Sequence, residues 1–113
     1  MKTDIIKYLE DILLSIEAIE LHLKETTELK EYQNNLTVID AVERRLSIIG
    51  EALYKVNKLN PILLITDKSK IVSLRHILIH EYDLIEDATI WNIVHKNLPV
   101  LKREILESVK KIS

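Results

Sequence analysis

The sequence predicts an all-α fold, an antiparallel bundle of four to five helices in one domain over residues 1–113. The first observation behind this prediction is that the chain holds one Gly and two Pro, too few for the many turns of a β fold. The second is that apolar residues, 47% of the chain, recur at helical spacing over long stretches. A chain of 113 residues can bury one core, which favours a single domain.

The first helix is expected to run to about Lys24, with Thr3 or Asp4 as its N-terminal cap. Glu10 and Glu17 lie mostly on its polar side. The apolar positions recur three and four residues apart and define one broad face: Ile5, Leu9, Ile12, Leu13, Ile16, Ile19 and Leu23. This pattern is typical of a helix that packs one face against a core.

A short helical turn is expected over 27–33, ended by Asn34 and Asn35, and a second long helix over 37–57. The apolar stripe of that helix is Val38, Ile39, Val42, Leu46, Ile49, Leu53 and Val56. Gly50 costs a helix interior about 1 kcal/mol relative to Ala, and close contact with a neighbouring helix is the favoured explanation. Pro61 then marks the break that follows this helix after Asn57, because proline lacks a backbone N–H and restricts the residue before it.

A third helix is expected from a cap at Thr66 or Asp67 to about Glu81, and residues 82–85 are expected to form a connection. The last helical region should span 88–112. Pro99 lies inside it, so a kink or break is expected near Asn97, with Pro99 in the first turn of the second half.

Composition excludes several classes of protein. No cysteine is present, which rules out disulfides and thiolate metal sites and suits a reducing, cytoplasmic location. The N-terminal residues lack the apolar run of a signal peptide, and no stretch approaches the ~20 apolar residues of a membrane span. A net charge of −2 disfavours bulk attraction to nucleic acid, so any RNA contact must be made by a local patch.

The candidate active site lies in the stretch 74–83, where Arg75, His80 and Tyr82 stand among apolar residues. A histidine with pKa near 6.5 can exchange a proton at neutral pH, and a guanidinium fits phosphate oxygens. Together they match metal-free RNA cleavage, in which a base activates the ribose 2′-hydroxyl and a cation stabilises the phosphorane. A salt-bridged structural pair is the commoner fate of an Arg and a His on one helix.

Helical spacing constrains this site. His76 and His80 are four residues apart and share a face, whereas Arg75 and His80 lie about 140° apart. The latter pair can converge through the long Arg side chain, a helix end near His80, or a second copy of the chain. His76-x3-His80-Glu81 could also bind zinc, but Ile77 stands where the zinc-protease pattern needs Glu. Neither a metal nor a cofactor is therefore expected.

The pattern Arg75-x4-His80-x-Tyr82 resembles the signature of the HepT-like toxins of the HEPN superfamily. The resemblance covers nearly the whole chain, because further segments fall in the family's order: 40–45, 48–52, Pro61, Ile90-Trp91 and 98–101. It implies a HEPN-like helical bundle that acts as a homodimer and cleaves RNA without metal. Arg75 and His80 would be catalytic, and His76, at a position usually polar and often Asn in this branch, would orient the site or contact RNA.

The same resemblance implies a type II toxin whose partner is a minimal nucleotidyltransferase antitoxin (MNT). That antitoxin would transfer AMP onto Tyr82, placing negative charge and bulk beside Arg75 and His80. By ordinary packing, Tyr82 would instead lie at a helix end with its hydroxyl in water. The alternative function is a non-catalytic helical dimer that binds a nucleotide or a nucleotidyltransferase.

Three further residues have open roles in the sequence. Arg44 and Arg45 point about 100° apart on a helix, so at most one faces a cleft. The ordinary expectation for either is solvent or an ion pair with Glu43, Glu51 or Glu81. Trp91 could stack a base, but between Ile90 and Ile93 it is expected to belong to the core.

Overall fold

The computed structural model describes residues 2–80 and 86–112, and most of these residues are helical. The elements follow in the order α1 (Lys2–His22), α2 (Leu29–Gln33), α3 (Leu36–Leu59), α4 (Lys68–His80), α5 (Asp87–Asn92), η2 (Ile93–Asn97) and α6 (Leu98–Ile112). Since α5, η2 and α6 continue one another, the described part of the chain forms five helices, which confirms the all-α prediction. Among the helices that the structure describes, none combines the length and the hydrophobicity that a membrane span requires.

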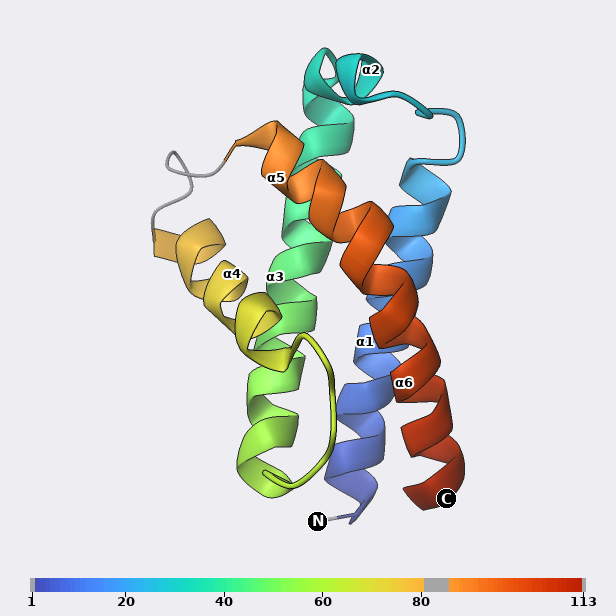
Figure 1. Cartoon of the computed structure of the whole chain (residues 1–113), viewed down its shortest axis with the longest axis vertical. Helices are drawn as coiled ribbons and strands as arrows, with labels where there is room; N and C mark the ends of the chain where they lie inside the picture. Colours follow the sequence, from blue (N-terminus) through green and yellow to red (C-terminus); the bar gives the residue numbers. More distant parts are fainter. Residues whose placement is uncertain (1, 81–85, 113) are drawn as a thin grey trace.

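Helix α3 is the centre of this arrangement. It packs antiparallel to α1 on one side and is crossed by α4 on the other, while α6 lies along α1 (Figure 1). The short α2 caps the end of the bundle where α1 ends and α5 begins. The described residues measure 42 × 28 × 20 Å along their principal axes. Helix α4 carries the candidate site. Among the described helices, it packs extensively only against α3.

The core forms from the apolar stripes that the sequence predicts. Every position of the α3 stripe is buried except Val38, which is half-buried against the core. Helix α1 contributes five buried apolar residues: Ile5, Leu9, Ile12, Ile16 and Ile19. Helices α4 and α6 add Ile71, Leu74, Leu78, Leu98, Leu101 and Ile105 to the core. Burial of such side chains contributes about 1.5–3 kcal/mol each, so packing of these stripes stabilises the bundle.

Helix starts differ in detail from the sequence predictions. Helix α1 already includes Thr3 and Asp4, so the prediction that one of them caps it is wrong. Asn35 is the cap of α3, because its side-chain oxygen accepts a hydrogen bond from the Val38 backbone N–H at 3.2 Å. A helix start without a strong local signal depends on packing as much as on the cap residue.

The beginning of α4 is tied to the last helix. Thr66 donates its hydroxyl to Glu104 at 2.6 Å and its backbone N–H to the same carboxylate at 3.1 Å. Asp67 accepts a hydrogen bond from the Asn97 side chain at 2.8 Å. The predicted capping residues therefore bond to α6 and η2, and these bonds anchor the first turn of α4.

The predicted irregularity near Asn97 is a turn of π-helix. In η2 the backbone N–H of Leu98 bonds to the carbonyl of Ile93, five residues earlier. Pro99 follows as the second residue of α6, as predicted for the first turn after the break. A proline ring clashes with the carbonyl four residues before it, here that of His95, and a widened turn is one way a helix accommodates this.

Candidate active site

Gly50 lets α3 and α4 approach closely at Arg75. An ideal Cβ built on Gly50 would overlap the Cβ of Arg75 and would lie 3.1 Å from the carbonyl oxygen of Ile71. A side chain at Gly50 would therefore push the two helices apart. The prediction that Gly50 marks a close helix contact is confirmed, and this contact fixes the backbone of α4 at Arg75.

The Arg75 guanidinium is held by two residues of α3. Its Nη1 donates a hydrogen bond to Glu51 Oε2 at 2.5 Å, which also makes an ion pair. The guanidinium carbon lies 5.0 Å from the centre of the Tyr54 ring, within range of a cation–π interaction. Because both partners belong to one helix, the position of the Arg75 side chain follows from the packing of α4 on α3.

Arg75 remains partly accessible to solvent. Its side chain is 24% exposed, and that of Glu51 is 41% exposed. Nε is buried and has no hydrogen-bond partner among the described residues, which leaves the Nη atoms as the part that could meet a phosphate. A phosphate could replace or share the hydrogen bond to Glu51, since a guanidinium has five N–H donors. The geometry thus presents an oriented cation that a carboxylate balances in the absence of an anionic ligand.

The other predicted site residues are described only in part. His76 lies exposed on α4, one residue after Arg75. His80 is the last residue of α4, and its side chain lies outside what the structure describes. Tyr82 and Glu81 lie outside the described residues, so their predicted roles and the zinc hypothesis are not tested. Within the described residues, no group of three or more His, Asp or Glu is arranged to hold a metal ion.

Glu51 and Tyr54 are the contacts of Arg75 that the sequence did not identify. Glu51 was expected as a possible partner of Arg44 or Arg45; it pairs instead with Arg75 and, at 3.9 Å, with Lys55. Neither Arg44 nor Arg45 makes an ion pair within the described residues. The spacing of Glu51 and Lys55 signals their own pairing, but nothing local signals a contact across 24 positions of sequence.

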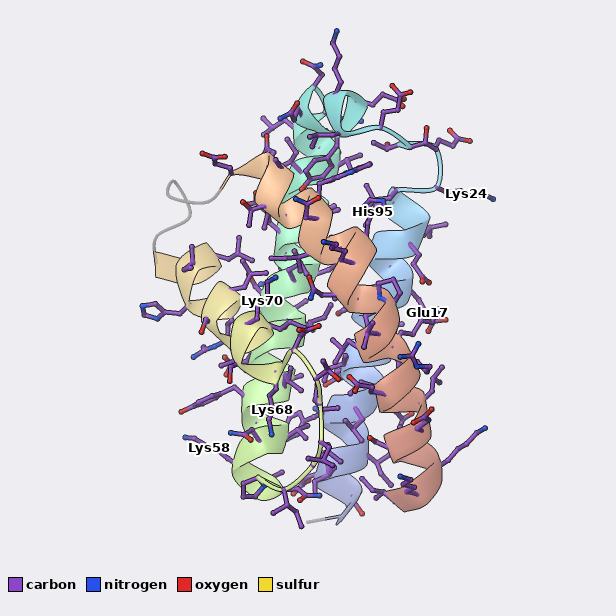
Figure 2. All side chains as sticks on the ribbon, viewed as in Figure 1. Glu17, Lys24, Lys58, Lys68, Lys70 and His95 are labelled. Carbon is purple, nitrogen blue, oxygen red and sulfur yellow. The ribbon has the colours of Figure 1, made fainter. Side chains whose placement is uncertain are left out.

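A second polar region lies at the other end of α3. The Tyr32 ring is 1% exposed and packs against Trp91, with ring centres 5.4 Å apart, and its hydroxyl has no hydrogen-bond partner among the described residues. The centre of the Trp91 ring lies in turn 4.1 Å from the centre of the His95 ring. Figure 2 labels His95. Trp91 is half-buried against the core, in agreement with the packing role expected for it.

Acidic residues surround this second region. Burial raises the pKa of the Tyr32 hydroxyl, and the negative charges of Glu43, Asp87 and Asp40 raise it further. Burial also raises the pKa of Glu43, with Asp87 and Asp40 adding to the effect. Among the described residues, none of these carboxylates makes an ion pair of the kind that Glu51 makes with Arg75, and we assign the region a packing role.

Similarity to known proteins identifies the family of the chain. The family model described as "Ribonuclease HepT-like" matches residues 12–108. Three similar proteins come from Methanocaldococcus jannaschii. "Putative RNase MJ1380" is 34% identical over 92% of this chain and 95% of its own length, and "Putative RNase MJ1216" is 30% identical over 96% and 84%. No solved structure matches the chain.

The third relative is longer. It is named "Gamma-glutamylcyclotransferase and putative RNase MJ0434", and it is 35% identical over 99% of this chain but only 50% of its own length. The chain thus spans half of that relative and nearly all of MJ1380. The family match covers most of the chain, including both helices that form the Arg75 site. The chain belongs to the HepT-like ribonuclease family of the HEPN superfamily.

Proposed function

We propose that this chain is a metal-independent endoribonuclease that acts as the toxin of a type II toxin–antitoxin pair. The observation that carries the proposal is the Arg75 guanidinium, oriented by Glu51 and Tyr54 at the α3–α4 contact of a HepT-like chain. Two relatives of similar length carry the name "Putative RNase", which supports RNA as the substrate. A partly exposed guanidinium is suited to a phosphodiester.

In the proposed reaction, His80 accepts the proton of a ribose 2′-hydroxyl while that oxygen attacks the adjacent phosphorus. Arg75 stabilises the negative charge that builds on the phosphorane oxygens. The bond to the 5′-oxygen then breaks, and an imidazolium returns a proton to the leaving oxygen. The products are a 2′,3′-cyclic phosphate and a free 5′-hydroxyl. His76, adjacent to Arg75 on α4, orients the site or contacts the RNA.

The proposal includes a homodimer. Arg75 faces α3 at the Gly50 contact. On an ideal helix, His80, five residues later, points about 140° away from Arg75 around the helix axis. A second copy of the chain can supply the Arg75 or His80 that completes each site. Sedimentation equilibrium should therefore give twice the mass of the chain, and mixing inactive Arg75→Ala with inactive His80→Ala should restore part of the cleavage.

The catalytic claim is tested with purified protein and single-stranded RNA in excess EDTA. Arg75→Ala and His80→Ala should each reduce the cleavage rate by at least about 10²-fold, the cost of removing a charge-stabilising group in the first case and a general base in the second. Arg103→Ala and His22→Ala, which change exposed residues of the same types on α6 and α1, are matched controls and should cleave normally.

Two outcomes would overturn the catalytic claim. In the first, the wild-type chain fails to cleave RNA while remaining folded, which would favour the non-catalytic dimer. In the second, cleavage stops when EDTA is added and returns with a divalent metal. A 2′-deoxy substitution at the cleaved nucleotide should block the reaction, because the attacking hydroxyl is then absent.

The regulatory claim concerns Tyr82 and a minimal nucleotidyltransferase antitoxin. Co-expression with the transferase should raise the intact mass of the chain in steps of one AMP and abolish cleavage, because negative charge is added beside the site. Tyr82→Phe should cleave RNA and gain no mass. Tyr54→Phe is the control, since Tyr54 also lies beside Arg75. If Tyr82→Phe is still labelled, or Tyr54→Phe is not, the acceptor has been assigned to the wrong residue.

A further inference from the structure

A groove of about 390 Å³ runs between α1 and α3 next to the Arg75 site. The residues of its lining that matter here are Lys7 and Tyr8 from α1 and Arg44, Ser47, Glu51 and Lys55 from α3. The α3 residues recur at intervals of three and four and form one stripe along that helix. From Arg44 to Lys55 the stripe extends for about 16 Å, at 1.5 Å per residue.

The groove contains cations that are available to an anionic ligand. Arg44 is exposed and makes no ion pair within the described residues. Lys7 lies 3.6 Å from Asp11 and Lys55 lies 3.9 Å from Glu51, and all four of these side chains are more than 40% exposed. Exposed ion pairs of this kind contribute about 0–1 kcal/mol, so either lysine can turn to a phosphate at little cost.

Tyr8 gives the groove an aromatic surface. It is half-buried, and the ammonium groups of Lys7 and Lys55 lie 5.3 and 5.4 Å from its ring centre. Proteins that bind single-stranded nucleic acid combine cations along the backbone with aromatic rings on which bases stack. A base that stacks on Tyr8 must be unpaired, so this surface favours single strands over duplexes.

Glu51 connects the groove to the candidate active site. One oxygen of its carboxylate bonds to Arg75 Nη1, and the other lies 3.9 Å from Lys55 Nζ. The same side chain is therefore a wall of the groove and the partner of Arg75. A strand lying in the groove would therefore pass the carboxylate that holds Arg75.

We propose that this groove binds single-stranded RNA beside the cleaved bond. Arg44, Lys7 and Lys55 contact the phosphates, and Tyr8 stacks one base. This inference rests on the proposed ribonuclease function and adds to it the path of the substrate. It also distinguishes between the two adjacent arginines, because Arg44 lines the groove and Arg45 is not among its lining residues.

The test measures binding and cleavage separately. Fluorescence anisotropy with a 2′-O-methyl oligoribonucleotide, which lacks the attacking hydroxyl, reports binding alone. Arg44→Ala should weaken this binding about tenfold, while the matched Arg45→Ala should bind as the wild type does. Lys24→Ala is the lysine control for Lys7→Ala, because Figure 2 shows Lys24 near the end of α1 opposite to its N-terminus. Circular dichroism should show each variant folded.

The salt dependence of binding and a substitution of Tyr8 distinguish phosphate contacts from base stacking. Each phosphate contact on a single strand contributes about 0.7 to the slope of log affinity against log salt, so Arg44→Ala should lower the slope by that amount. Tyr8→Leu, which keeps an apolar side chain in the half-buried position, should weaken binding about tenfold without changing the slope. A duplex of the same sequence should bind more weakly than the single strand.

Equal effects of Arg44→Ala and Arg45→Ala would overturn the inference. A change of oligomeric mass in Arg44→Ala at unchanged RNA affinity would also overturn it, by making the groove a protein interface. If the wild type cleaves RNA and all groove variants bind normally, the groove assignment fails and the ribonuclease function stands. If the groove variants lose binding but the wild type never cleaves, the groove stands and the catalytic proposal fails.

Discussion

Helix α3 carries two polar regions that are built in opposite ways. At Glu51 a carboxylate meets the Arg75 guanidinium, and both side chains are partly exposed. At Glu43, about two turns earlier, a half-buried carboxylate shares its surroundings with Asp40 and Asp87 and with the buried Tyr32 hydroxyl. The first region balances opposite charges near solvent, whereas the second gathers like charges beside an aromatic cluster.

This difference separates a site suited to chemistry from one suited to packing. A partly exposed cation can exchange its carboxylate partner for a phosphate at modest cost, because water and the new anion replace the lost bond. A hydroxyl that is buried without a hydrogen bond has no bonding partner to exchange for a ligand, and its burial costs about 1–3 kcal/mol. We therefore expect substitutions near Tyr32 to change stability and substitutions near Arg75 to change function.

The largest effect on stability is expected at Tyr32. Tyr32→Ala removes a fully buried ring that packs on Trp91 and should lower the free energy of unfolding by about 3–5 kcal/mol. Tyr32→Phe keeps the ring and removes a hydroxyl that has no hydrogen-bond partner among the described residues, so it should be neutral or stabilising. Urea denaturation measures both variants. A loss above 1 kcal/mol in Tyr32→Phe would mean that the hydroxyl has a partner.

A smaller loss is expected at Gly50. Gly50→Leu should separate α3 from α4 and cost about 1–3 kcal/mol, because its Cβ would overlap Arg75. Ser69→Leu, at an exposed position on α4, is the control and should change stability little. Hydrogen exchange should show faster exchange in α4 than in α1 for the Gly50 variant. Uniform exchange across both helices would mean that the contact does not position α4 in particular.

The acidic region should give a pH dependence. The pKa of Glu43 is raised above its ordinary 4.5 in the folded chain, so the folded state holds this proton more tightly than the unfolded state does. The resulting stability is fully present below pH 4.5 and is lost as the pH rises through the raised pKa. Glu43→Gln should therefore gain melting temperature relative to the wild type as pH rises from 4 to 7. The exposed Glu17→Gln should follow the wild type; equal curves for both variants would contradict the assignment.

The smallest stability effect is expected at Glu51. Since Glu51 is 41% exposed and Arg75 24%, Glu51→Gln should change the free energy of unfolding by less than about 1 kcal/mol, as measured in urea. The same change should alter the pH dependence of cleavage or the apparent affinity for RNA, because it removes the charge that balances Arg75. A stability loss of 2 kcal/mol or more would show instead that the pair is mainly structural.

Local sequence signals predicted most of the fold. Most residues of the α1 and α3 stripes lie in the observed core, Pro99 marks the π-helical turn, and Gly50 marks the close approach of α4. These signals act within one helix or its immediate surface, where the 3.6-residue repeat and backbone sterics decide the outcome. The wrong prediction, a cap at Thr3 or Asp4, concerns a helix end, where side-chain preferences are weak.

The sequence by itself thus determined that the chain forms long amphipathic helices and that Arg75 lies in an apolar segment able to seat it. Only the tertiary structure decided which residues face Arg75. Glu51 and Tyr54 meet it because α4 crosses α3 at Gly50, and Arg44 rather than Arg45 lines the neighbouring groove because of how α3 is rotated against α1. The physical reason is that helix rotation and crossing depend on the packing of all the helices together, which no single stretch of sequence specifies.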